Sequence, residues 1–518
     1  MLCVDEWCLL LSIINNCTIR LRRHSEKEGR SSRKLFPFFP LLARTNISQS
    51  NMVKVACLGA GYVGGPTCAV LALKAQVQER IAGWNSNELP IYEPGLHEVV
   101  MQCRGKTLFF TTDIKKAIQE ADIVFVSVQT PTKKTGIGAG VASDLTYIES
   151  CARTIAEHSE SDKIIVEKST VPCGTASVIQ TILKANNPKG LKYQVLSNPE
   201  FLAEGTAIDD LMNPDRVLIG SNTDAGGLEA AQKLKSLYAA WVEPSKIFLV
   251  NTWSSELSKL AANAMLAQRV SSVNALSALC EVTGANVSEV TRACGMDQRI
   301  GKHFLQASLG FGGSCFQKDI QSLVYISQSL HLNEVADYWR QVMTINDYQK
   351  VRFVKRIISR MFDTVTHKKI AVLGFAFKKN TGDTRETAAA TVVRLLAQDN
   401  ANVFVYDPKV KEDSMLFELR QGVSEQEFQQ IQKKITHSKS VLEACSGADA
   451  VVICTEWDEF KDTNMNYEEV YKVMRKPAFL FDGRLIVNAS KLSKIGFQVE
   501  VIGSASSQKH DTRFYKEE

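Results

Sequence analysis

From residue 53 onward, short hydrophobic runs typical of strands alternate with stretches in which hydrophobic positions have helical spacing. Short runs rich in β-branched residues occur at 53–58, 123–128, 164–167 and 194–196, and stretches with helical spacing lie between them. Strands that alternate with helices are typical of a parallel sheet covered by helices on both faces. The first half of the chain is therefore predicted to be a doubly wound α/β domain.

A second series of the same kind begins near residue 368. Its strands are predicted at 370–373, 402–406, 450–454 and 479–482. The segment KVACLGAGYVG (54–64) can be aligned with KIAVLGFAFKK (369–379), and ADIVFVSVQTP (121–131) with ADAVVICTEWD (448–458). Two such halves indicate two Rossmann-like units, each with a nucleotide site at the carboxyl ends of its strands.

Between the halves, residues 253–280 contain no Pro or Gly, and apolar residues recur there at helical spacing. We expect one long central helix, which packs the halves together and contributes to subunit contact. The predicted domains are a disordered extension (1–51), a dinucleotide-binding Rossmann domain (52–252), a central helical domain (253–364), a second Rossmann-like domain (365–504) and a flexible tail (505–518).

A glycine motif follows the first predicted strand. Gly59, Gly61 and Gly64 form GxGxxG at the opening of a helix, where glycines let a pyrophosphate approach backbone N–H groups. Three such glycines can also make a mere tight turn, and the strand before them favours the dinucleotide site.

The second strand of the first unit is missing from this pattern. In a sheet of order 3-2-1-4-5-6 it lies between the first and third strands and ends in an acid about 20 positions after the first glycine. Glu79 meets that spacing, but KAQVQERIAGWNS (74–86) has too few β-branched residues for a strand. The strand can be absent from the protein or only from the sequence as written. As written, we expect unpaired backbone donors, weak dinucleotide binding or poor folding of this domain.

Residues 1–51 differ from the rest of the chain. Asp5 and Glu6 precede the apolar run 8–14, which fits neither a secretory signal nor a transit peptide. We expect a disordered extension, with the folded protein starting near Met52.

Composition excludes several classes of function. The net charge of +5 is spread along the chain, which gives no support to nucleic-acid binding. The 13 cysteines form no CxxC pair, so neither a metal site nor a disulfide framework is expected, and a reducing cytoplasmic compartment follows. The apolar runs are shorter than the roughly 20 residues that span a bilayer, so no membrane segment is expected.

The segment GFGGSCFQKDI (310–320) carries the most reactive combination of residues. Most cysteines are small buried hydrophobes. Cys315, however, follows a glycine-rich loop and precedes a predicted helix start, where the helix dipole and Lys318 would favour the thiolate. Asp319, four residues on, can orient a water or take a proton.

Two further pairs have helical spacing. Lys259 and Asn263 lie four apart on the central helix, and Glu200 and Glu204 lie four apart in NPEFLAEG. Each pair alone would suit a solvated helix face. Together with the glycine motif and Cys315, they favour a catalytic site.

At this point a resemblance becomes specific. GAGYVGGP, VSVQTPT, VEKSTVP, LSNPEFLAEGTAI, NPDRVLIG, ELSKLAANA, RIGKHFL, GFGGSCFQKDI, GFAFKKNTGDTRET and FDGR occur in this order. Over residues 52 to about 503 the chain resembles the UDP-glucose/GDP-mannose dehydrogenase family. The resemblance implies NAD-dependent four-electron oxidation of UDP-glucose to UDP-glucuronate, through a cysteine thiohemiacetal and thioester.

The resemblance also implies roles for individual residues. Cys315 would be the nucleophile, Lys259 and Asn263 would stabilise an oxyanion, Glu200 would transfer a proton, and Asp319 and Thr170 would position water. The implied NAD contacts are Gly59, Ala60, Gly61, Tyr62, Val63, Gly64, Ser127, Val128, Gln129, Thr130, Ser169, Thr170, Val171, Glu204, Lys318 and Arg385. The implied substrate contacts are Glu200, Phe201, Leu202, Lys259, Asn263, Arg299, Phe311, Gly312, Phe377, Lys378 and Arg484.

Arg299 would reach the substrate of a neighbouring subunit, which implies a dimer-based homo-oligomer, commonly a hexamer. Two alternatives stay open at this point. The missing strand beside a complete second half allows an inactive UDP-sugar-binding subunit. The same chemistry could also act on another sugar nucleotide, such as UDP-N-acetylmannosamine or GDP-mannose.

Overall fold

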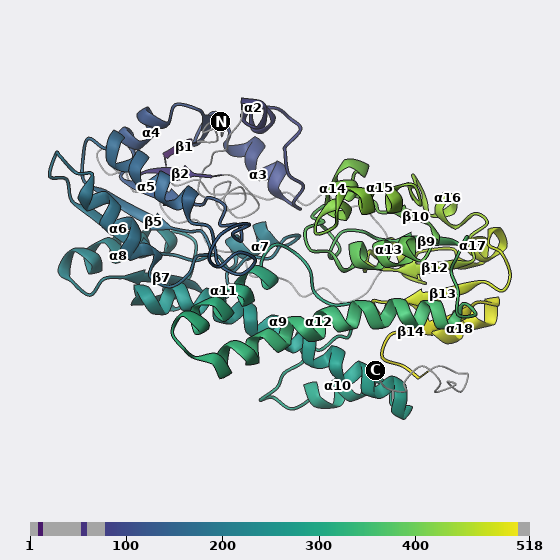
Figure 1. Cartoon of the computed structure of the whole chain (residues 1–518). Coiled ribbons are helices and arrows are strands. Elements are labelled where there is room, and N and C mark those ends of the chain that lie inside the picture. Colours follow the sequence, from purple (N-terminus) through teal and green to yellow (C-terminus); the bar gives the residue numbers. More distant parts are fainter. Residues whose placement is uncertain (1–8, 14–52, 60–77, 506–518) are drawn as a thin grey trace, which may run out of the picture.

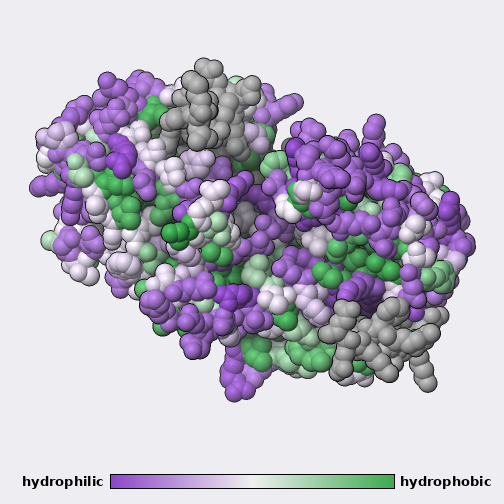
Figure 2. Space-filling model, viewed as in Figure 1, coloured by the Kyte–Doolittle hydropathy of each residue, from purple (hydrophilic) through white to green (hydrophobic). Residues whose placement is uncertain are grey.

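The computed structural model describes residues 9–13, 53–59 and 78–505. Two α/β units lie at opposite ends of the molecule, and the long helices α9 (Thr252–Thr283) and α12 (Asn333–Arg360) run below and between them (Figure 1). This architecture confirms the predicted pair of Rossmann-like domains joined by a long central helix. Hydrophilic residues dominate the face in Figure 2, with hydrophobic patches between them.

The first unit contains an eight-stranded sheet of order β3-β1-β2-β4-β5-β6-β7-β8. Its strands are β1 (Leu9–Ile13), β2 (Lys54–Leu58), β3 (Leu108–Thr111), β4 (Ile123–Val126), β5 (Lys163–Glu167), β6 (Tyr193–Ser197), β7 (Val217–Ser221) and β8 (Ile247–Asn251). The second unit has a six-stranded sheet of order β11-β10-β9-β12-β13-β14, in which all the strand pairs are parallel. These strands are β9 (Lys369–Leu373), β10 (Asn402–Tyr406), β11 (Ile435–His437), β12 (Ala450–Ile453), β13 (Phe479–Asp482) and β14 (Gln498–Val501).

Helices cover the sheets and build the centre. Those of the first unit are α2 (Gln78–Asn85), α3 (Leu96–Cys103), α4 (Ile114–Glu120), α5 (Thr146–His158), α6 (Thr175–Ala185), α7 (Ala207–Met212), α8 (Ala225–Tyr238) and the 3-10 turn η2 (Pro244–Lys246). The centre adds α10 (Val287–Gly295) and α11 (Phe316–Ser329) to α9 and α12. The second unit has α13 (Ala388–Gln398), α14 (Glu412–Arg420), α15 (Glu425–Gln432), α16 (Val441–Cys445), η3 (Asp458–Phe460), α17 (Tyr467–Val473) and α18 (Ala489–Ile495).

The predicted strands form because their β-branched runs are buried on both faces of a sheet. Every residue of β4 and of β12 is buried, as expected for interior parallel strands between helical layers. The second sheet has the order 3-2-1-4-5-6 when its strands are counted along that unit. Sequence analysis therefore located the central strands correctly to within one or two residues at their ends.

Helix α9 begins and ends where its sequence allows. The side chain of Asn251 accepts a hydrogen bond from Ser254 N at 2.8 Å, which caps the first turn. Gly284, at φ 84°, ends the helix in the left-handed conformation that glycine adopts without strain.

The prediction of an empty position in the first sheet is wrong. Strand β1, from the segment expected to be disordered, lies between β2 and β3 and pairs antiparallel with both. Leu11, for example, is opposite Ala56 on one side and Phe109 on the other. The backbone groups of β2 and β3 expected to be unpaired are therefore paired by a strand that runs opposite to the expected one. Glu79 belongs to helix α2, so no strand forms there.

A buried ion network joins the second unit to the central helices. Arg356 Nη1 lies 2.8 Å from Glu281 Oε1 on α9, and Arg360 Nε lies 2.7 Å from Glu500 Oε1 on β14. Arg356 also pairs with Glu500, and Arg352 pairs with Glu281. Removing one partner of such buried pairs leaves an uncompensated charge, so the network holds the second sheet against α9 and α12.

None of the helices within the described ranges is long and apolar enough to cross a bilayer.

The pairing of β1 predicts a stability effect of the first 51 residues. Deleting residues 1–51 would expose the facing edges of β2 and β3, and unpaired backbone groups destabilise a folded domain. We expect the first thermal transition to fall by on the order of 10 °C. Amide exchange at 54–58 and 108–111 should accelerate. Deleting residues 506–518 is the control, and equal melting and exchange in both truncated proteins would refute the role of β1.

Candidate active site

Cys315 lies immediately before helix α11, where the sequence placed it. Glycines precede it because the loop passes close to other parts of the chain. A Cβ on Gly310 would lie 2.5 Å from Asn346 Oδ1, and one on Gly313 would lie 3.0 Å from the ring of Phe377. Gly313 N also donates to Arg385 O at 2.9 Å. The loop is thus fixed against α12 on one side and against the second unit on the other.

The predicted pair on α9 is buried and converges on this helix start. Asn263 Nδ2 donates to Asp319 Oδ2 at 2.6 Å, and both side chains are buried. Lys259 is buried one turn earlier on α9, with its ammonium 5.5 Å from the ring centre of Phe201. The interpretation of this pair as a solvated helix face is therefore wrong. Asp319 N donates to Cys315 O at 2.9 Å, which places the carboxylate one turn beyond the thiol.

Glu200 and Glu204 do not share a helix, contrary to the prediction. They lie in a non-helical segment after β6. Glu200 accepts hydrogen bonds from Phe201 N at 2.7 Å and Leu202 N at 3.0 Å. The proline in NPEF and the glycine in AEGT are the sequence signals for that loop.

The electrostatics of Glu200 keep it ionised. Lys168 Nζ lies 2.9 Å from Glu200 Oε2, and both side chains are buried. Burial acts to raise the pKa of Glu200, but Lys168, the backbone N–H of Phe201 and Lys259 outweigh it and lower that pKa below its ordinary value. The result is a carboxylate available as a proton acceptor.

The pKa values of Cys315 and Asp319 shift in the other direction, above their ordinary values. Burial raises the pKa of the Cys315 thiol, and Glu204 and Asp319 add to this effect, whereas Lys259 and Lys318 oppose it. The expectation that the helix start and Lys318 would favour the thiolate is therefore wrong for the free protein, because desolvation exceeds both. Burial likewise raises the pKa of Asp319 above its ordinary value despite Lys318 and Lys259.

The carboxyl ends of β2, β4 and β5 form the edge expected to bind NAD. A Cβ on Gly59 (φ 103°) would lie 2.4 Å from Ser127 O, so only glycine fits where these strands end. Ser169 Oγ donates to Val128 O at 2.7 Å, and Thr130 Oγ1 donates to Thr170 O at 2.7 Å. Val171 is buried beside them and Gln129 is exposed. Ala60, Gly61, Tyr62, Val63 and Gly64 lie outside the described residues.

This edge is connected directly to the cysteine helix. Lys318 Nζ donates to Thr130 Oγ1 at 3.0 Å, which joins α11 to the segment holding Thr170. The described residues therefore fit a dinucleotide. Gly59 allows a ligand to approach the backbone closely, Thr130 and Ser169 provide hydroxyl groups, and Lys318 provides a positive charge for an anionic ligand.

Residues of the second unit approach from the opposite side. Arg484 Nε donates to Cys454 O at 2.6 Å, and Arg484 Nη2 donates to Phe377 O at 2.8 Å. Its guanidinium therefore binds the backbone of the segments that follow β12 and β9. Lys378 lies with its ammonium 5.4 Å from the ring centre of Phe377. A Cβ on Gly312 would lie 2.4 Å from Glu386 O, and Phe311 packs edge-on against Phe316.

Arg299 does not contact the other predicted site residues within the described part of the chain. Its side chain is 89% exposed and pairs with Asp297 on the outside of the protomer. A single chain does not test the expected contact with a neighbouring subunit.

Sequence analysis missed three contributors to the site. Lys168 neutralises Glu200, Arg216 stacks on Phe201 at 4.0 Å from guanidinium carbon to ring centre, and Glu93 accepts hydrogen bonds from Gly205 N and Ala207 N, each at 2.8 Å. Lys168 and Arg216 stand inside the quoted segments VEKSTVP and NPDRVLIG, but only a structure shows which side chains they meet.

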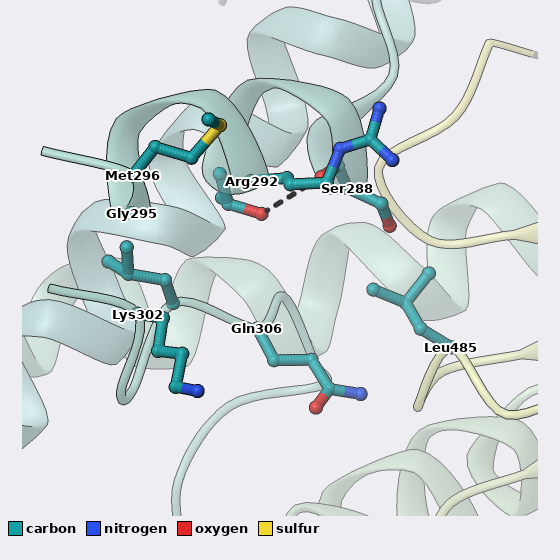
Figure 3. Close-up of a pocket in the computed structure, with 9 residues that line it drawn as sticks. Ser288, Arg292, Gly295, Met296, Lys302, Gln306 and Leu485 are labelled. Atoms are coloured by element: carbon teal, nitrogen blue, oxygen red, sulfur yellow. Dashed lines mark hydrogen bonds between the residues drawn. The ribbon is translucent and has the colours of Figure 1, made fainter.

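A separate pocket of about 500 Å³ lies beside α10 (Figure 3). Arg292, Lys302, Gln306 and Leu485 are among the residues that line it, and the lining contains no carboxylate, cysteine or histidine. The groups suited to the expected oxidation are therefore those around Cys315. Within the described ranges no cluster of three or more His, Cys, Asp or Glu side chains could hold a metal.

Comparisons with known proteins agree with this geometry. Models of the UDP-glucose/GDP-mannose dehydrogenase family match residues 53–242 (NAD binding domain), 253–348 (central domain) and 371–489 (UDP binding domain). UDP-glucose 6-dehydrogenase 3 of Oryza sativa subsp. japonica is 58% identical over 469 residues, which are 87% of this chain and 97% of the rice protein. UDP-glucose 6-dehydrogenase of Drosophila melanogaster is 56% identical over 460 residues, 87% of this chain and 96% of that protein.

Solved structures show the same architecture. A UDP-glucose dehydrogenase from the hyperthermophilic archaeon Pyrobaculum islandicum has a TM-score of 0.73 at 28% identity, covering 87% of this chain and 97% of that one. A UDP-D-ManNAc dehydrogenase from Pyrococcus horikoshii has a TM-score of 0.70 at 26% identity, covering 86% and 98%.

Proposed function

The chain belongs to the UDP-glucose/GDP-mannose dehydrogenase family, is an NAD-dependent UDP-glucose dehydrogenase, and, we propose, carries the sugar on Cys315 between two oxidations. The product is then UDP-glucuronate. The supporting observation is the position of Cys315 at the start of α11, facing the buried polar groups of α9. Neither an inactive subunit nor another sugar is proposed, because relatives named for UDP-glucose match at 56–58% identity.

When bound, NAD supplies a hydride acceptor for each of the two oxidations. The Cys315 sulfur adds to the C6 aldehyde left by the first one, forming a C–S bond while the thiol proton passes to the new hydroxyl. The second oxidation would remove a hydride from that carbon and a proton from its hydroxyl, which leaves a thioester on Cys315.

Lys259 and Asn263 stabilise the oxygen as negative charge develops on it. A buried ammonium and an amide donor held by Asp319 are preorganised, so they need no rearrangement when the charge appears. In hydrolysis, Glu200 takes a proton from the attacking water, as its lowered pKa allows, and Asp319 and Thr170 position that water. Breaking the C–S bond returns the thiol and releases the acid.

The NAD site is proposed at the carboxyl edge of the first sheet, with Gly59 to Gly64, 127–130, 169–171, Glu204, Lys318 and Arg385. UDP-glucose is proposed to lie between that edge and the second unit. The segments holding Phe201, Leu202, Phe311, Gly312, Phe377, Lys378 and Arg484 would hold it there, and Arg299 would reach the site of a neighbouring subunit.

We propose that the protein is cytoplasmic and forms a dimer-based homo-oligomer, which is commonly a hexamer in this family. The nine described cysteines are all free, as in a reducing compartment. Large apolar side chains of α9 are exposed on a single chain, which favours a subunit interface: Trp253, Leu257, Met265, Leu276, Leu279 and Val282.

Sedimentation of the full chain tests this assembly. The expected mass is a multiple of the 57.4 kDa protomer, because burial of the apolar α9 surface favours association. A single species of protomer mass at micromolar concentration would contradict the assembly.

Replacing the nucleophile tests the covalent route. Cys315→Ser should allow the first oxidation yet lower UDP-glucuronate formation by about a thousandfold or more, because a serine hydroxyl is a far weaker nucleophile than a thiol. Product analysis should find the aldehyde or unreacted sugar. The control is Cys294→Ser, at an exposed free cysteine, which should make the acid normally. Full conversion to the acid by Cys315→Ser would exclude the route.

A further inference from the structure

Two buried carboxyl groups lie outside the residues assigned so far. Glu167 is the last residue of β5, and Glu256 lies in the second turn of α9; their exposed fractions are 1% and 2%. Within the described part of the chain, neither forms an ion pair with a lysine, arginine or histidine. The two carboxyl groups lie within hydrogen-bonding reach of each other. Two ionised carboxylates buried in contact would repel each other strongly, so this contact requires a shared proton.

Both side-chain oxygens of Glu256 accept hydrogen bonds from the N-terminal end of helix α6. Gly174 N donates to Glu256 Oε2 at 2.6 Å, and Ala176 N donates to Oε1 at 2.9 Å. These are the first N–H groups of α6, whose own N-cap, Gly174, has no side chain to accept them. Burial raises the pKa of Glu256 as well, but these backbone donors and Glu167 oppose that shift. A carboxylate at this position also opposes the positive end of the helix dipole, so Glu256 is the member better suited to carry the charge.

Glu167 has the complementary environment. Neither of its side-chain oxygens accepts a hydrogen bond from any described N–H or O–H group. Burial, and then the neighbouring Glu256, raises the pKa of Glu167 well above its ordinary range. Glu167 is therefore the member of the pair better suited to hold the proton, with the Glu256 carboxylate as its acceptor.

The two residues enclose a short loop. Glu167 directly precedes residues 168–173, and the N–H of the next residue, Gly174, is bonded to Glu256. The loop contains Ser169, Thr170 and Val171, and Thr170 O accepts from Thr130, which is itself bonded to Lys318. Glu256 also precedes Lys259 by one turn on α9. One helix thus holds both the end of this loop and the ammonium beside the reactive centre.

We propose that Glu167 and Glu256 are a one-proton carboxyl pair that positions the Thr170 loop against α9, and so sets its register to Lys259 and Cys315. Both are positioning residues, because neither touches the reacting atoms. The functional consequence rests on the proposed NAD contacts of 169–171; the structural part does not.

A matched pair of isosteric variants tests the assignment. Glu167→Gln keeps a side-chain donor towards Glu256 and should leave the loop within about twofold of the wild-type behaviour. Glu256→Gln removes the charge and turns an amide N–H towards backbone donors. In the protein without NAD, amide exchange at 169–176 should then accelerate by about tenfold or more, the loss expected for charge-assisted hydrogen bonds.

Kinetics supply the functional readout. Glu256→Gln should raise KM for NAD by a similar factor and leave KM for UDP-glucose nearly unchanged, since the loop belongs to the first unit. An equal acceleration of amide exchange in both variants, or unchanged amide exchange in Glu256→Gln, would overturn the assignment of the carboxyl pair. Faster exchange with an unchanged KM for NAD would keep the pair and refute the NAD contacts of the loop, so the two proposals fail separately.

A spectroscopic measurement does not depend on the folding of Glu256→Gln. Infrared difference spectra of wild type against Glu167→Gln should show the carbonyl band of one neutral carboxylic acid at neutral pH, present in the wild type and lost in the variant. Absence of that band from the wild type would overturn the one-proton assignment.

Discussion

The hydrogen bond from Asn263 to Asp319 is the contact on which the site depends. It is 2.6 Å long and joins α9 to α11 in the interior, where neither group has water as an alternative partner. Lys259 lies one turn before Asn263, and Cys315 lies one turn before Asp319. The register of this single bond therefore sets how the ammonium faces the sulfur. The helices that carry it also hold the two sheets, so the geometry of the chemistry follows from the packing of the centre.

Within that frame, burial and neighbouring charge separate groups that would otherwise behave alike. Lys168 and the backbone N–H of Phe201 lower the pKa of Glu200, whereas desolvation raises the pKa values of Asp319 and Cys315. Carboxyl groups whose environments shift their pKa values in opposite directions can take opposite roles in proton transfer. At the buried carboxyl pair of β5 and α9, burial raises both pKa values, and backbone N–H donors of α6 oppose that shift at Glu256.

Much of the fold was predictable from local patterns. Interior strands such as β4 and β12, the central helix α9 and the helix start at Cys315 follow from residue type, periodicity and glycine placement alone. Strand β1 was not, because its partner β2 lies more than 40 residues away and its direction opposes the expected strand. The contact of Glu200 with Lys168 was missed for a related reason, because spacing along the chain does not show which distant side chains meet. The loop at Glu200 was predictable from the proline and glycine of its segment, but the four-residue spacing to Glu204 favoured a helix. The thiol pKa was mispredicted because desolvation depends on packing, which no motif contains.

In the proposed mechanism, one sulfur at the junction of α9 and α11 carries the sugar between the oxidations. Acid quenching during steady turnover, followed by proteolysis and mass measurement, tests it most directly. We expect a hydroxylamine-labile UDP-glucuronyl adduct on the peptide containing Cys315 and on none of the other twelve of the 13 cysteines. Rapid turnover with that peptide unmodified, or with the adduct on a different residue, would contradict it.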